Sequence, residues 1–288
     1  MFEVFSFTAF YAEAIRQTLV GMLRGDFGGI ADMQALNNNG WGYVTAVAVG
    51  MSILYSWQGP AFFTAALRPG TAAMTPGCFG ALASILTLAQ IGNSLWIGCL
   101  EWIMNQFGSS VLESYEMVSG ASGSGSLFFY SSILAPITEE LLFRGFLQGR
   151  LRPFGRKFAV LGSAVLFALF HGNLMQAPYA FAAGLVLGYT AERYGVGWAI
   201  GLHALNNLVL ADLLTRLLEI LPPLGQQLLD GGFLLFGLAA IGILITNRHA
   251  VGDFNREGTD PRCVKCLLTS PGIAAFTALA VLSMAATL

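Results

Sequence analysis

Long apolar segments follow one another through most of the chain, separated by short polar connections. A helix needs about 20 apolar residues to cross a bilayer, within a range of about 17–25. The segments that reach or approach this length are residues 42–58, 81–106, 126–149, 157–172, 175–191, 196–215, 231–247 and 271–288. They predict an all-α fold, a polytopic bundle of about eight transmembrane helices that forms a single integral membrane domain over residues 1–288.

The composition separates this chain from soluble proteins. Its residues are 55% hydrophobic and 10% charged, with a mean hydropathy of +0.66. A soluble domain carries about 25% charged residues, so this chain has too few polar side chains to cover a soluble core. The formal net charge of −2 and the lack of a basic stripe exclude nucleic acid as a partner. The lipid bilayer is the expected surrounding.

The N-terminal segment and the charged connections between the predicted spans suggest how the bundle lies in the membrane. Residues 2–24 are apolar but contain Glu3, Glu13 and Arg16, which fits an interfacial N-terminal helix or a further span. Lys and Arg gather at 150–157 and 248–265, which fall on one side when the spans alternate. The positive-inside rule makes that side cytoplasmic. Small size and the lack of an organelle signal favour a prokaryotic cytoplasmic membrane.

Three charged residues lie inside the apolar segment 126–149, namely Glu139, Glu140 and Arg144. A charged side chain at the centre of a membrane helix costs roughly 2.5–3.5 kcal/mol on an insertion scale, so such residues need a partner or a function. Glu140 and Arg144 are four residues apart and share a helix face. Glu139 lies about 100° around the helix from Glu140. We therefore expect an ion pair between Glu140 and Arg144, with Glu139 directed elsewhere.

Two of the three histidines also lie in apolar segments. The stretch "FALFH" ends at His171, and "HALNN" places His203 and Asn207 four residues apart. Counted along the helices, Glu139, His171 and His203 are expected to reach a shared depth in the bilayer. Each group alone could simply bond neighbouring helices together. Their combination on three segments of a chain with few charges favours a chemical site.

Hydrolysis of a peptide bond suits this set of side chains. It requires a base that takes a proton from water and donors that stabilise the developing oxyanion. We expect Glu139 to be the base and His171 to orient the water. His203 and Asn207, on one helix face, could donate N–H groups to the oxyanion.

The stretches "EELLFR" (139–144), "FALFH" (167–171) and "HALNN" (203–207) together resemble three motifs of the CAAX protease and bacteriocin-processing (Abi) family of intramembrane proteases. These motifs are EExxxR, FxxxH and HxxxN, in the same order, and they place a catalytic core in residues 126–215. The resemblance implies a glutamate-dependent endopeptidase with an eight-helix core. Its functional residues would be Glu139, Glu140, Arg144, His171, His203 and Asn207, with Arg144 as the structural partner of Glu140.

The resemblance also implies a membrane-anchored protein or peptide as substrate, which is prenylated or bears a sorting signal, and no cofactor. Three alternatives stay open. Two histidines and a glutamate could hold zinc with an open position, although no HExxH is present. A catalytically idle homologue could act as a binding or immunity scaffold. A proton-coupled transporter also uses intramembrane Glu, Arg and His, but no inverted repeat is visible. The pair Cys263 and Cys266 is a weak sign of a separate metal site.

Overall fold

The computed structural model describes residues 40–112, 124–249 and 269–285, together with the single positions 15, 115, 264 and 265. Within these residues all regular secondary structure is helical and no strand occurs, which confirms the predicted all-α class. The predicted N-terminal helix within residues 2–24, apart from position 15, and the pair Cys263 and Cys266 lie outside the described residues.

Three of the described helices are long and apolar enough to cross a membrane. They are α5 (Pro76–Asn105), the continuous helix Val196–Ile220 and α14 (Pro223–Thr246). The remaining predicted segments also overlap helices, but these helices do not meet the criteria of length, hydropathy and charge. They are α3 (Trp41–Gln58), the composite helix 125–151, α10 (Arg156–Phe170), α11 (Ala177–Tyr194) and the short apolar α17 (Pro271–Ala285). The chain is thus a helical membrane protein in which three described helices meet these criteria, compared with the eight spans expected.

The composite helix that carries Glu139 changes its hydrogen-bond pattern along its length. Its parts are α7 (Gly125–Phe129), η1 (Tyr130–Leu134), α8 (Ala135–Glu140), η2 (Leu141–Gln148) and α9 (Gly149–Leu151), followed by the 3-10 turn η3 (Arg152–Phe154). Both η1 and η2 are π-helical. Pro136 is the second residue of α8, just after η1, and has no N–H for the regular α-helical bond, which favours a local change of pattern there. Such π turns shift which side chains share a face, and they occur often at functional sites.

A third π-helical segment follows His203. It is η4 (Asn206–Leu213), which joins α12 (Val196–Leu205) to α13 (Leu214–Ile220) in the continuous helix Val196–Ile220. Asn207 therefore lies in a π-helical segment, whereas His203 lies in the α-helix before it. The two side chains need not share the face that the regular i,i+4 spacing predicts.

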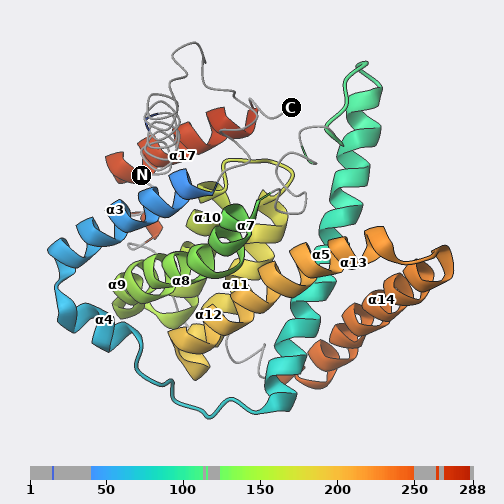
Figure 1. The fold of residues 1–288 in the computed structure, drawn as a ribbon. Helices are drawn as coiled ribbons and strands as arrows, with labels where there is room; N and C mark the ends of the chain where they lie inside the picture. Colours follow the sequence, from blue (N-terminus) through green and yellow to red (C-terminus); the bar gives the residue numbers. More distant parts are fainter. Residues whose placement is uncertain are drawn as a thin grey trace, which may run out of the picture.

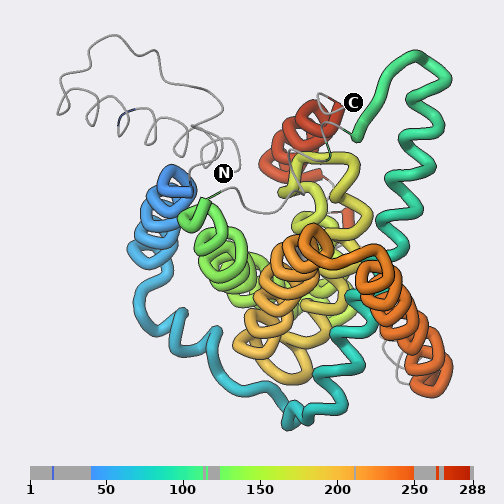
Figure 2. Tube along the Cα trace, turned by 45° about the vertical axis from the view of Figure 1, so that its right-hand side comes forward, coloured from blue at the N-terminus to red at the C-terminus, as the bar shows by residue number. Residues whose placement is uncertain are grey.

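The helices surround a central group formed by α8, α10, α11 and α12 (Figure 1). On one side of this group lie α3 and the short α4 (Pro60–Ala66), and on the other side lies α5 with α14 packed along it (Figures 1 and 2). The contacts between elements follow this order: α10 packs on α11, α11 on α12 and on α5, and α12 on α8. The three elements that carry the sequence motifs are consequently neighbours in space.

Two of the central helices, α10 and α11, approach each other closely. A Cβ atom at Gly184 of α11 would lie 3.0 Å from both the Cα and Cβ atoms of Ala164 in α10. Small residues at such positions let membrane helices approach and pack. On the same face, Gly188 lies against Val160 of α10 and Gln148 of η2. This contact sets how far α10, and therefore His171 at its end, stands from the rest of the site.

Candidate active site

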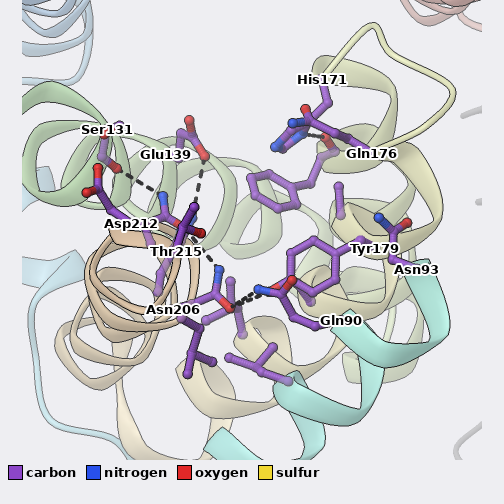
Figure 3. A pocket seen from close by; sticks show the side chains of 18 of the residues that line it. Gln90, Asn93, Ser131, Glu139, His171, Gln176, Tyr179, Asn206, Asp212 and Thr215 are labelled. Atoms are coloured by element: carbon purple, nitrogen blue, oxygen red, sulfur yellow. Dashed lines mark hydrogen bonds and ion pairs between the residues drawn. The ribbon is translucent and has the colours of Figure 1, made fainter. Parts of the chain in front are cut away.

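A polar cavity of about 340 Å³ lies between α5, η1, α8, α10, α11 and η4 (Figure 3). Its lining includes four of the six residues expected from the sequence, namely Glu139, His171, His203 and Asn207. The other two, Glu140 and Arg144, are buried behind it. Residues from three distant segments of the sequence therefore meet around one space.

Glu140 and Arg144 form the ion pair that their spacing predicts. The Nε atom of Arg144 lies 3.2 Å from Oε2 of Glu140, and both side chains are fully buried. The contact lacks the N–H direction of a hydrogen bond, so its stabilisation is mainly coulombic. Arg144 also donates from Nη2 to the carbonyl of Gly184 (3.3 Å), and its guanidinium lies 4.3 Å from the ring centroid of Phe167. Such stacking partly compensates the desolvated cation.

Glu140 has a second partner that the sequence did not predict. Its Oε1 atom accepts a hydrogen bond from Nδ1 of His203 at 2.9 Å. A carboxylate only accepts, so Nδ1 carries the proton. The other ring nitrogen, Nε2, faces Glu139 with 3.9 Å to its Oε2 atom. When Nε2 is also protonated, the charges of the cluster balance. The two carboxylates of Glu139 and Glu140 then face two cations, Arg144 and His203.

His171 is held in one tautomer by the backbone. Its Nδ1 atom lies 2.9 Å from the carbonyl oxygen of Phe167, and because a carbonyl only accepts, Nδ1 is the protonated nitrogen. In the neutral ring this leaves the lone pair of Nε2 free to accept a hydrogen bond. The Phe167 ring packs edge-on against both His171 and His203, with centroid distances of 4.8 and 5.9 Å. Phe167 therefore contacts both imidazoles and the guanidinium of Arg144.

Asn207 is part of a chain of side-chain amides. Its Nδ2 atom donates to the carbonyl of Ser131 (3.0 Å), and its Oδ1 atom accepts from Nδ2 of Asn206 (3.0 Å). Asn206 in turn accepts from Nε2 of Gln90 (3.3 Å) and from the hydroxyl of Tyr179. These bonds assign the orientation of the Asn207 amide. They occupy one of its two N–H groups and leave the other for a further acceptor.

The described residues contain no group of three or more His, Cys, Asp or Glu side chains arranged to hold a metal ion. Within the site, Glu140 is bound to Arg144 and His203, and Nδ1 of His171 is bound to a backbone carbonyl. The possible ligand atoms that remain on the cavity wall are the Glu139 carboxylate and the Nε2 atoms of His171 and His203.

Comparison with protein families identifies this arrangement. Residues 122–209 match the family described as type II CAAX prenyl endopeptidase Rce1-like. This part of the chain is an Rce1-like CAAX endopeptidase domain. The match contains all six expected site residues and confirms the resemblance seen in the three motifs. The family is one of proteases, so this domain is that of a peptide hydrolase. Comparisons with curated proteins and with solved structures gave no match.

Two helices outside the Rce1-like domain complete the space around Glu139. On the α5 side, Gln90 and Asn93 line the polar cavity (Figure 3). On the α3 side lies a second cavity of about 90 Å³, lined by apolar residues that include Met51, Leu54 and Trp57. Glu139 belongs to the lining of both cavities. This carboxylate therefore stands between a polar space and an apolar one.

The interpretation of the sequence missed the polar residues outside the three motifs. Gln90 and Asn93 interrupt an otherwise apolar segment, and polar side chains in such a segment are a signal that they face the protein interior. Asn206 lies inside the "HALNN" stretch but at a position that the HxxxN motif leaves unspecified, so the motif did not single it out. The hydrogen bond of Tyr179 to Asn206 carries no sequence signal, because it depends on how α11 packs beside η4.

Proposed function

We propose that this chain is an intramembrane endopeptidase that hydrolyses a peptide bond of a membrane-associated protein with water activated by Glu139. One observation carries the proposal. Glu139 and Nε2 of His203 face each other across 3.9 Å in the cavity that His171 also lines, inside an Rce1-like domain. A base, a group that orients water and an N–H donor are the parts that direct attack by water requires.

The proposed reaction begins with a water molecule between Glu139 and His171. Its hydrogens are directed to the Glu139 carboxylate and to the lone pair of His171 Nε2. Glu139 takes a proton as the water oxygen attacks the carbonyl carbon of the scissile bond. The resulting tetrahedral intermediate carries a negative oxygen.

Two donors would hold that oxygen, namely Nε2–H of protonated His203 and the second N–H of Asn207. Glu139 then gives its proton to the leaving nitrogen as the C–N bond breaks, and a new carboxylic acid and an amine are released. No covalent enzyme intermediate is formed. Glu139 is then again a carboxylate and can take a proton from another water molecule.

Glu140 and Arg144 act indirectly in this proposal. Glu140 accepts from Nδ1–H of His203 and so orients the ring with Nε2 toward Glu139 and the cavity. Arg144 neutralises the other oxygen of the same carboxylate. Both are positioning residues for His203, because neither lines the cavity in which the substrate would bind.

The apolar cavity beside Glu139 suggests the kind of substrate. A cavity of about 150 Å³ in another protein holds a benzene molecule. At about 90 Å³, this cavity suits a branched aliphatic side chain next to the scissile bond. A peptide with such a residue close to a prenyl or other membrane anchor fits both this cavity and the family described above.

In the membrane, we propose that the bundle comprises about eight spans, which adds α3, the composite helix 125–151, α10, α11 and α17 to the three long apolar helices. The positively charged connection around Arg150 would face the cytoplasm of a prokaryotic cell. Labelling of single cysteines placed in the connections, from either side of sealed vesicles, tests this arrangement.

Cleavage by the purified full chain tests the function. The probe is a quenched fluorogenic peptide that ends in a prenylated cysteine followed by three residues. We expect the chain in lipid nanodiscs to release the three-residue fragment and Glu139→Gln to release none. The matched control is Glu219→Gln, which changes an exposed glutamate at the end of α13 and should retain full activity. Equal activity of wild type and Glu139→Gln would refute the role of Glu139.

Two further measurements distinguish this proposal from the zinc-dependent protease and from the idle homologue. Activity that persists in a strong chelator excludes the zinc-dependent version, and activity that is lost in chelator and restored by zinc supports it. A wild-type chain that binds the peptide without cleaving it would instead be the idle homologue.

A further inference from the structure

The side chain of Asn206 connects the proposed oxyanion donor, Asn207, to two other helices. Asn206 is buried, and its Nδ2 atom donates to Oδ1 of Asn207 at 3.0 Å. Its own Oδ1 atom accepts from Nε2 of Gln90 in α5 (3.3 Å) and from the hydroxyl of Tyr179 in α11 (Figure 3). An amide oxygen has two lone pairs, so these two bonds use its full capacity.

The direction of each bond in this chain follows from the backbone carbonyl of Ser131. A carbonyl only accepts, so the Asn207 atom that lies 3.0 Å from it is Nδ2. Oδ1 of Asn207 then faces Asn206 and requires a donor, which is Nδ2 of Asn206. The oxygen of Asn206 is thereby turned toward Gln90 and Tyr179, which both donate to it. Reversal of the Asn206 amide would place two oxygens against each other, which costs free energy in a buried position.

The bond between Asn206 and Asn207 is unusual for adjacent residues of a helix. In an α-helix successive side chains diverge by about 100° and do not face each other. Asn206 and Asn207 are the first two residues of the π-helical segment η4. A π turn closes over five residues instead of four, so that successive side chains diverge less. The π-helical segment therefore favours a contact that a regular α-helix would disfavour.

We propose that Asn206 is a positioning residue for Asn207, and that Tyr179 and Gln90 hold Asn206 in the required orientation. The inference rests on the proposed function, in which the second N–H group of Asn207 binds the oxyanion. Ser131 and Asn206 hold the Asn207 carboxamide at its two polar atoms, which leaves the remaining N–H group one direction. Donors that are fixed before the charge develops are the ones that lower the barrier. Gln90 lies outside residues 122–209, so the family match does not include this support from α5.

A purely structural role would have different consequences. Side-chain amides often bond membrane helices together, and these bonds would then only tie η4 to α5 and α11. Such a role does not depend on the amide of Asn207, whereas positioning acts through it. A double-mutant cycle with Asn207→Ala therefore separates the two roles.

Tyr179→Phe is the first variant, because it removes one hydroxyl and keeps the ring. We expect it to lower kcat for the prenylated fluorogenic peptide by about three- to ten-fold, as for one hydrogen bond of ordinary strength, with KM nearly unchanged. In the Asn207→Ala background the same substitution should change kcat by less than about two-fold, because the group being positioned is gone. An equal loss of kcat in both backgrounds, or an unchanged kcat with a lower unfolding temperature, would overturn the inference.

A second variant tests the support from α5 independently. Gln90→Leu removes the other donor to Asn206, and it should show the same dependence on Asn207. Tyr179→Phe/Gln90→Leu should lower kcat further, toward the loss that Asn207→Ala produces. Tyr189→Phe is the matched control, because it removes a hydroxyl from an exposed position of α11, and it should leave kcat and KM unchanged.

Binding of an oxyanion mimic distinguishes failure of this inference from failure of the proposed function. The probe is the same prenylated peptide with a phosphinate, an anionic tetrahedral group, in place of the scissile bond. Its affinity should fall about three- to ten-fold in Tyr179→Phe and should show no further fall when Asn207→Ala is already present. This result in a chain that cleaves nothing supports the positioning role without the protease. Cleavage by the wild type without such coupling leaves the protease and overturns the positioning role, and a wild type that neither cleaves the peptide nor binds the phosphinate overturns both.

Discussion

Glu140 and His203, which are 63 residues apart in the sequence, are joined by a buried hydrogen bond of 2.9 Å between Oε1 and Nδ1. The same carboxylate lies 3.2 Å from the guanidinium of Arg144. The two adjacent glutamates of the "EELLFR" stretch thus approach the same imidazole from different sides, one at each ring nitrogen. Glu140 orients the ring, and Glu139 faces the nitrogen that borders the cavity.

Glu140 forms an ion pair with Arg144 and a hydrogen bond with His203, and the two contacts should have separable effects on stability and on activity. Glu140→Leu leaves a buried arginine without its counter-ion, so we expect a loss of about 3–5 kcal/mol in the free energy of unfolding. In Glu140→Leu/Arg144→Leu neither charge is left alone, and most of that stability should return. Activity should stay absent in both variants, because His203 has lost the acceptor that orients it. Recovery of cleavage by the double variant would show that Glu140 serves stability only.

Removal of the amide of Asn207 should affect the chemical step more than binding. Loss of one oxyanion donor typically lowers kcat by about 10²–10³-fold. We expect this effect from Asn207→Ala, with KM for the fluorogenic peptide changed by less than about three-fold, since the donor acts mainly in the transition state. Asn247→Ala, at the exposed end of α14, is the control for loss of an amide. A raised KM with an unchanged kcat would place Asn207 in ground-state binding instead.

The size of the apolar cavity should decide which substrate side chains are accepted. Met51 lines this cavity, and methionine positions tolerate substitution well. Met51→Ala should therefore enlarge the space and shift the preference toward a larger side chain, whereas Met51→Phe should favour a smaller one. One methylene in an apolar pocket is worth about 10–200-fold in kcat/KM, so a peptide series with Ala, Val, Leu and Phe beside the scissile bond can resolve the shift. The same ranking in both variants would argue against contact with the substrate.

The close approach of α10 and α11 should be sensitive to a single methyl group. A Cβ atom at Gly184 would meet the backbone and side chain of Ala164 at 3.0 Å. Since the helices would have to move apart, Gly184→Ala should destabilise the chain by about 1–3 kcal/mol. Gly201→Ala is the matched control on α12, because nothing lies within 4 Å of its added Cβ. Thermal unfolding of both variants in one detergent measures the difference, and equal unfolding temperatures would contradict it.

The sequence was most informative where physical constraints are local. Apolar runs predicted the helices because a helix in lipid satisfies its own backbone hydrogen bonds. The spacing of Glu140 and Arg144 predicted their ion pair, which the structure confirms. The contact of Glu140 with His203 was not predictable in this way, because it depends on the packing of α8 against α12. The π-helical segments η1, η2 and η4 were also not predicted, and they alter the angular relation on which i,i+4 arguments depend.

The residues around Glu139 belong to two different kinds of segment. The six proposed site residues all come from residues 122–209, while part of the wall of each cavity comes from α3 or α5, outside that range. Under the proposed function, the catalytic residues and part of the substrate-binding wall are therefore encoded by separate stretches of the gene. Selection could remodel the outer helices to suit a new target and leave the hydrolytic apparatus intact. Under this arrangement, proteins that share the same inner motifs would diverge in what they cut.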